Sequence, residues 1–121
     1  MKNKDESYKH RAAINVLKKW LSRQFIVKTE MEFCKKDKIQ FIPDITCFKK
    51  GRIPEGQSRE IVAFYEVEHT HGIDSKKLTR MHYWLYSNQS QAGIYEVQAE
   101  WILRQIKRPD ILEYIDYSIE I

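Results

Sequence analysis

The spacing of apolar residues predicts a helix at the start of the chain, followed by three strands. Over residues 5–24, apolar side chains such as Ala13, Leu17 and Leu21 recur every three or four positions, which places them on one face of a helix. Residues 25–33 and 39–48 are rich in apolar and β-branched side chains, and residues 61–67 alternate with a period of two, as strands do. A polar turn at 35–38 joins the first two strands.

The second half of the chain predicts a helix, a strand and a less regular end. Asp74 or Ser75 can cap a helix that runs to about residue 87. Residues 93–98 alternate as a strand does, and a helix from about residue 99 is expected to break at Pro109 before a last strand at 117–121. The order helix, three strands, helix, strand predicts an α/β fold with a central sheet flanked by helices.

The loop between the second and third strands fixes which residues face each other. Residues 49–59 contain two Gly and one Pro, so they predict a hairpin loop centred near Glu55. Asp44 and Glu66 each lie eleven residues from that centre, so they are expected to lie opposite each other, with Glu68 next on the same face. The three carboxylates would then lie within about 5–8 Å of one another.

Two interpretations of these acids follow from the spacing. Three ionised carboxylates this close repel one another unless they share a proton or bind a divalent cation. Oxygen ligands suit a hard ion, Mg²⁺ or Mn²⁺. The alternative is that Glu66 and Glu68 lie on a solvated face of the sheet and that Asp44 is an acid at a strand end.

Length and composition are those of one small globular domain. The chain has 121 residues, of which 42% are hydrophobic, so we expect a single domain over 1–121 with a short flexible tail at 1–4. The formal net charge of +4 fits a phosphate-bearing partner. There is no apolar run long enough to span a membrane and no signal-peptide pattern, so a cytoplasmic protein with reduced Cys34 and Cys47 is expected.

Basic residues form two candidate phosphate-binding groups. The first group lies in the hairpin loop, expected beside the acids, and comprises Lys49, Lys50, Arg52 and Arg59. The second group, at the start of the helix after the third strand, comprises Lys76, Lys77 and Arg80. Cations are unfavourable at a helix N-terminus, so the second group indicates an anionic partner or the nearby carboxylates. For both groups, an ordinary charged surface is the alternative.

Histidine and aromatic residues give weaker signals. His69 and His71 share a face at the end of the third strand and are candidates for a metal or phosphate contact, although solvent-exposed histidines would show the same spacing. His10 and His82 are expected to be structural. The side chains of Tyr83, Trp84 and Tyr86 can stack on bases if exposed, whereas core packing or a dimer surface explains them more simply.

Pro43-Asp44, Glu66-Val67-Glu68 and the helix over 75–86 together resemble the PD-(D/E)XK, or restriction-endonuclease-like, nuclease superfamily. The resemblance implies a restriction-endonuclease-like core in which Asp44, Glu66 and the backbone carbonyl of Val67 bind Mg²⁺ or Mn²⁺. The usual lysine of the motif is replaced by Glu68, which can be a further metal ligand, a general base or the mark of a lost active site. Lys76 or Lys77 can supply the missing positive charge.

The resemblance implies a divalent-metal-dependent DNA endonuclease that hydrolyses phosphodiester bonds. Restriction-like, mobile-element and Holliday-junction-resolvase enzymes all fit this expectation. Cutting both strands needs two sites, so a homodimer is expected. The alternative is a catalytically decayed module that keeps the fold for DNA binding or assembly, and an RNA-cleaving or protein-binding use of the same scaffold is a third possibility.

Overall fold

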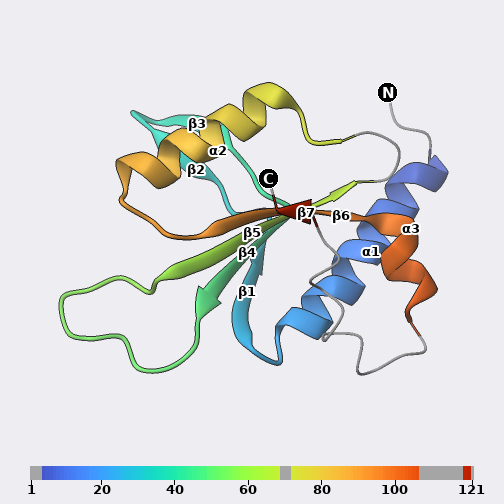
Figure 1. The fold of residues 1–121 in the computed structure, drawn as a ribbon, viewed down its shortest axis with the longest axis horizontal. Coiled ribbons are helices and arrows are strands. Elements are labelled where there is room, and N and C mark those ends of the chain that lie inside the picture. Colours follow the sequence, from blue (N-terminus) through green and yellow to red (C-terminus); the bar gives the residue numbers. More distant parts are fainter. Residues whose placement is uncertain (1–3, 69–71, 107–118, 121) are drawn as a thin grey trace.

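A mixed sheet forms the centre of the molecule, with helices on both of its faces (Figure 1). The structure is a computed structural model that describes residues 4–68, 72–106 and 119–120. Its elements are α1 (Lys4–Leu21), β1 (Phe25–Thr29), β2 (Phe33–Lys35), β3 (Lys38–Phe41), β4 (Ile45–Lys49), β5 (Ile61–Glu68), α2 (Ser75–Ser87), β6 (Gly93–Gln98), α3 (Ala99–Arg104) and β7 (Ile119–Glu120). The predicted α/β class with a central sheet flanked by helices is therefore confirmed.

The main sheet has the strand order β1-β4-β5-β6-β7. The pairs β1–β4, β4–β5 and β6–β7 are antiparallel, whereas β5 and β6 are parallel because α2 carries the chain back between them. The two-residue strand β7 lies within the last strand expected at 117–121. The break that the sequence predicts at Pro109 lies outside the described residues.

Alternation along β5 divides the core into two layers with different compositions. Ala63, Tyr65 and Val67 point to the face covered by α1 and α3, where they pack with aliphatic residues such as Leu17. Phe64 points to the other face, under α2, where an aromatic cluster is formed by Phe33, Phe41, Phe64 and Trp84. Glu66 follows Phe64 on the α2 face, so it lies under the first turns of that helix.

The first two predicted strands are each broken in two, which corrects the expectation of continuous strands over 25–33 and 39–48. Glu30 has a positive φ of 55°, which an extended strand does not allow, and it separates β1 from β2. Pro43, which has no N–H to donate to a ladder, lies between β3 and β4. As a result β2 and β3 form a separate two-stranded sheet, joined by a turn at Lys36 and Asp37 as predicted.

The register of the β4–β5 hairpin matches the sequence prediction at its acidic end. Ile45 pairs with Tyr65 and Thr46 pairs with Phe64, so Asp44 follows opposite Glu66. A bulge between Cys47 and Phe48 shifts the register by one residue on the loop side only. The predicted opposition of Asp44 and Glu66 is therefore retained.

The helix after β5 begins where the sequence placed it. The Asp74 side chain accepts a hydrogen bond of 3.1 Å from the Lys76 N–H and so caps α2. Both cysteines are free, as expected, with Cys34 exposed and Cys47 buried. Among the helices that the structure describes, none is long and apolar enough to cross a membrane.

Candidate functional site

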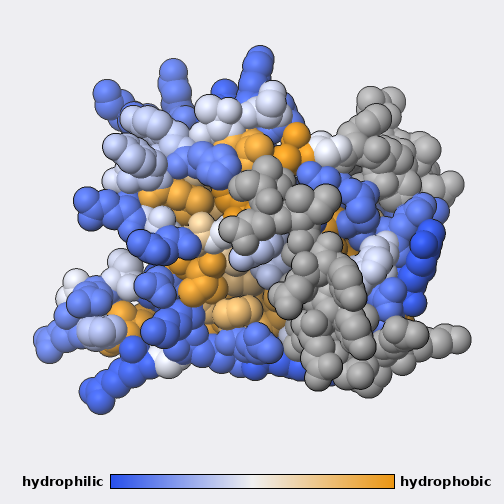
Figure 2. Space-filling view, in the orientation of Figure 1, coloured by the Kyte–Doolittle hydropathy of each residue, from blue (hydrophilic) through white to orange (hydrophobic). Residues whose placement is uncertain are grey.

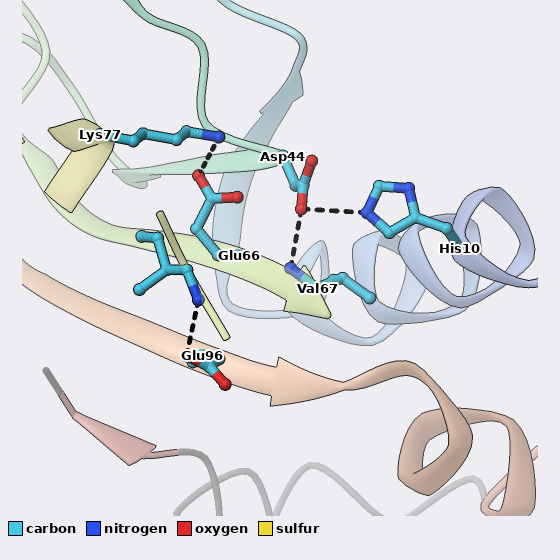
Figure 3. A network of polar contacts seen from close by, with 7 residues as sticks. His10, Asp44, Glu66, Val67, Lys77 and Glu96 are labelled. Carbon is cyan, nitrogen blue, oxygen red and sulfur yellow. Dashed lines mark hydrogen bonds and ion pairs between the residues drawn. The ribbon is translucent and has the colours of Figure 1, made fainter. Parts of the chain in front are cut away.

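The candidate site lies where β4 begins, β5 ends and α2 starts, and α1 closes one side of it (Figure 3). Glu66 comes from β5, Asp44 from the residue before β4, and Lys77 from the first turn of α2. In the close-up the carboxylates of Asp44 and Glu66 lie side by side, with Lys77 reaching Glu66 and His10 reaching Asp44. Segments far apart in the sequence thus meet at one point.

Glu66 is a buried acid with one cationic partner. Its side chain is only 3% exposed, and its Oε1 atom lies 2.7 Å from Nζ of Lys77. Burial and the negative charge of Asp44, opposed by Lys77, together raise the pKa of Glu66 to about 8. Glu66 therefore holds its proton more tightly than an exposed glutamate does, and a cation that binds its carboxylate has to displace that proton.

Asp44 is held in its ionised form by specific contacts. Its Oδ2 atom accepts a hydrogen bond of 2.7 Å from the Val67 N–H and lies 3.3 Å from Nε2 of His10. Burial alone would raise the pKa of Asp44. The bonds from His10 and Val67, with the charges of His10 and Lys77, outweigh burial and hold that pKa below its usual value. Asp44 is thus a fixed negative charge beside Glu66.

Glu68 has the properties of a group that exchanges protons near neutral pH. It is partly buried, and burial together with the charges of Asp44 and Glu96 raises its pKa to about 7. This pKa is close to the value that suits a general base at neutral pH. A lysine at this position, as in the usual motif, could not accept a proton while charged.

Two residues that the sequence did not assign to the site belong to it. Glu96 pairs with Glu66 across the parallel β5–β6 ladder, and its Oε2 atom accepts a 3.2 Å hydrogen bond from the Ile73 N–H. His10, expected to be structural, contacts Asp44 directly. A signal for His10 was present, because it lies three residues before Ala13 and so extends the apolar stripe of α1. The parallel register that places Glu96 has no local sequence signal.

The structure distinguishes the two lysines proposed as the displaced cation. Lys77 is the one whose ammonium meets Glu66, whereas the Lys76 side chain is exposed. Arg80, one turn further along α2, donates a 3.3 Å hydrogen bond to the Gln40 carbonyl of β3. The basic side of α2 therefore runs from the acids towards the β2–β3 hairpin.

The basic loop is not beside the acids, which corrects the sequence expectation. Asp44 precedes β4 and Lys49 ends it, so about five residues, or roughly 17 Å of extended strand, separate the acids from the loop. In Figure 2 the loop extends at the lower left and is covered largely by hydrophilic residues. The acids and the loop cations occupy opposite ends of the same hairpin.

Two of the four loop cations hold the loop in place. Lys50 Nζ donates to the carbonyls of Ser22 and Arg23 at 2.9 and 3.1 Å, and Arg59 Nη1 donates to those of Lys49 and Gly51 at 2.8 and 2.9 Å. These contacts give Lys50 and Arg59 a structural role. Lys49 and Arg52 are exposed and remain the candidates in this loop for contact with phosphates.

The donor atoms at the acidic end suit a hard divalent cation. Asp44 and Glu66 supply carboxylate oxygens. The Val67 carbonyl lies on the same side of β5 as the Val67 N–H, which donates to Asp44. Among the described residues, no group of three or more His, Cys, Asp and Glu side chains is arranged so that it could hold a metal ion. The Lys77 ammonium lies against Glu66, so a metal would share or replace that contact. His69 and His71 lie outside the described residues.

Comparison of the chain with protein-family models, with curated proteins and with solved structures finds no match.

Proposed function

We propose that this protein is a metal-dependent nuclease that hydrolyses phosphodiester bonds in DNA. The observation that carries the proposal is the buried carboxylate of Glu66, held between the Asp44 carboxylate and the Lys77 ammonium at the end of β5. Taken without the separate β2–β3 sheet, α1, the main-sheet strands β1, β4 and β5, the helix α2 and the strand β6 follow one another in the order expected of a restriction-endonuclease-like core. These two features support the resemblance found in the sequence.

Asp44, Glu66 and the Val67 carbonyl would hold Mg²⁺ or Mn²⁺. When bound, such an ion polarises a phosphate and makes a water molecule more acidic. Glu68, with a pKa raised to about 7, accepts the proton of the attacking water. Lys77 supplies positive charge beside the reacting phosphate, which the motif lysine would otherwise supply.

The orientation of Asp44 depends on α1. His10 and the Val67 N–H both contact the Oδ2 atom, which leaves Oδ1 directed away from this pair of contacts. Because two contacts already fix the Asp44 side chain, it would lose little conformational freedom when Oδ1 binds a cation. Cleavage of both strands of a duplex would require two such sites, so we propose a homodimer on DNA.

Cleavage assays test this proposal directly. Supercoiled, linear and four-way-junction DNA are incubated with the protein in Mg²⁺, Mn²⁺ or EDTA. We expect cutting only with the metals, and at least about a 100-fold loss in Glu66→Gln and Asp44→Asn. Glu60→Gln, which changes an exposed acid beside the loop, is the matched control. Normal cutting by both site variants would show that the site is assigned wrongly.

The second candidate is a DNA-binding module of the same fold that has lost catalysis. The observation that favours it is the Lys77 ammonium, which already lies against the Glu66 oxygen, together with a glutamate at the position of the motif lysine. Binding of DNA without cutting, in both Mg²⁺ and Mn²⁺ and on all three substrates, would favour this candidate over the nuclease.

A further inference from the structure

A groove lies between α2 and the β2–β3 hairpin, beyond the acidic site. Its volume is about 570 Å³, and its lining includes Cys34, Lys35, Gln40, Arg80, Tyr83 and Trp84. None of its described lining residues is acidic, whereas Lys35 and Arg80 are cationic. The groove therefore suits a ligand that carries negative charge.

The groove also offers aromatic surface that the core does not use. Trp84 packs against Phe33, Phe41 and Phe64, so it forms the inner wall. Tyr83, by contrast, is 60% exposed, and Nζ of Lys35 lies 5.4 Å from the centre of its ring. Because Lys35 lies over one face of this ring, a base can stack on its other face while the ammonium binds a phosphate by charge, a combination typical of sites for single-stranded nucleic acids.

Arg80 is held so that it faces this groove. Its Nη1 atom donates to the Gln40 carbonyl on the opposite wall at 3.3 Å. A guanidinium group has five N–H donors, so this single bond leaves donors for a phosphate. The contact joins α2 to β3 and sets the position of the charge along the groove.

The groove follows the proposed catalytic site along one helix. Lys77, Arg80 and Tyr83 are spaced three residues apart, so Tyr83 lies about 9 Å along the helix axis from Lys77 and about 120° around it. That length corresponds to about three stacked nucleotides of one strand. A strand whose phosphate lies at Lys77 can therefore place a nearby nucleotide at Tyr83 if it bends around α2 past Arg80.

We propose that this groove binds an unpaired nucleotide a few positions from the cleaved phosphate. Its base stacks on Tyr83, and its phosphate contacts Arg80 and Lys35. The base must be unpaired and unstacked, because in a duplex both of its faces are covered by neighbours. The inference rests on the proposed function and deepens it, since it assigns the preferred substrate to DNA with a single-stranded or distorted segment.

Cys34 makes occupancy of the groove measurable without any cleavage. It is exposed in the groove, whereas Cys47 is fully buried, so alkylation of the native protein by a maleimide reports on Cys34. The probe is a twelve-nucleotide oligothymidylate in EDTA, compared with the same length of duplex DNA and with an oligoglutamate peptide. We expect the single strand to slow labelling at least about fivefold, and the duplex and the peptide to have little effect.

The matched variants are Tyr83→Ala and Tyr86→Ala. Both tyrosines are exposed on α2, but Tyr83 lines the groove and Tyr86 does not. We expect Tyr83→Ala to weaken binding of the single strand by about fivefold or more, and Tyr86→Ala to leave it unchanged. In a mixed-sequence single strand, the nucleotides are replaced one at a time by an abasic nucleotide. Binding to the wild-type protein should weaken at one position of the strand. The same replacement should not weaken binding to Tyr83→Ala any further.

The outcomes separate this inference from the proposed function. Protection of Cys34 that depends on Tyr83, in a protein that never cuts DNA, supports the groove and rejects the nuclease. A protein that cuts DNA while Cys34 is labelled equally fast with and without the single strand overturns the groove. Equal effects of the two tyrosine substitutions, or equal protection by the acidic peptide, would also overturn it.

Discussion

The two ends of the β4–β5 hairpin carry charge in opposite ways. At the end under α1 and α2, Glu66 is 3% exposed and its pKa is raised to about 8. At the loop end the cations Lys49 and Arg52 are surrounded by solvent, and Lys50 and Arg59 bind backbone carbonyls instead. The difference shows that burial sets the surroundings of a charged group on this hairpin: protein encloses the carboxylate at one end, and solvent or backbone carbonyls meet the cations at the other.

The largest expected effect comes from removing the cation at the buried end. Lys77→Met leaves Glu66 without its charged partner, so we expect cleavage to fall at least about 100-fold and stability at pH 8 in EDTA to fall by about 2 kcal/mol. The loss of stability should be smaller at pH 5, where Glu66 is protonated in the folded state.

Lys76→Met is the matched control, because Lys76 is the adjacent residue on α2 and its side chain is exposed. Cleavage kinetics and urea unfolding of the two variants give the comparison. Similar losses in both would mean that the 2.7 Å contact between Lys77 and Glu66 has no special role.

The next effect is a dependence of stability on pH. The pKa of Glu66 is about 8 in the folded protein and near 4.5 ordinarily, so between these values the folded state binds a proton that the unfolded state has lost. The free energy of unfolding in EDTA should therefore fall as pH rises from 5 to 8, by about 2 kcal/mol or more. Glu68, with a pKa of about 7, adds to the same slope.

Glu66→Gln should flatten most of this pH dependence, and Glu60→Gln should leave it as it is, as measured by urea unfolding at several pH values. Mn²⁺ should stabilise the wild-type protein more at pH 8 than at pH 5, because protons compete with the metal for Glu66. Stability of the wild type that does not change over this range would contradict the buried environment of Glu66.

A smaller effect is expected where α1 meets the site. His10→Ala removes a contact that lowers the pKa of Asp44, so protons should compete better for that carboxylate. We expect Mn²⁺ binding, measured by thermal shift, to weaken several-fold at pH 6 and less at pH 8. His82→Ala changes an exposed histidine on α2 and serves as the control. An equal loss at both pH values would indicate that His10 acts only through packing.

The smallest effects belong to the loop end. Arg52→Ala should weaken DNA binding by two- to fivefold and reduce the salt dependence of log K by about 1, with no change in stability. Arg59→Ala removes two bonds to carbonyls, so it should lower stability by about 1 kcal/mol. Filter binding over a range of salt concentrations and urea unfolding measure the two effects. An unchanged salt slope in Arg52→Ala would exclude that loop from the DNA contact.

The sequence predicted the features of the fold that depend on nearby residues. The opposition of Asp44 and Glu66 follows from one hairpin loop, because antiparallel register is set locally by the turn. The capped start of α2 at Asp74 is local in the same sense. Which of two adjacent lysines reaches the acids depended on where that helix begins, and only the structure fixes it.

Features that depend on distant segments were missed. His10 meets Asp44 across 34 residues, and Glu96 joins the site through a parallel pairing that no turn specifies. The loop was placed wrongly for a different reason. Asp44 and Glu66 each lie eleven residues from the centre of the hairpin, so an extended strand separates them from the loop. The sequence alone therefore already excluded a loop beside the acids.

The bulge between Cys47 and Phe48 has a practical consequence for altering this protein. The bulge separates the register of the loop side from the register of the acidic side. Residues can therefore be inserted into or removed from 51–58 while Ile45 stays paired with Tyr65. A tag can therefore be inserted at that tip while Asp44 stays opposite Glu66 at the other end of the hairpin.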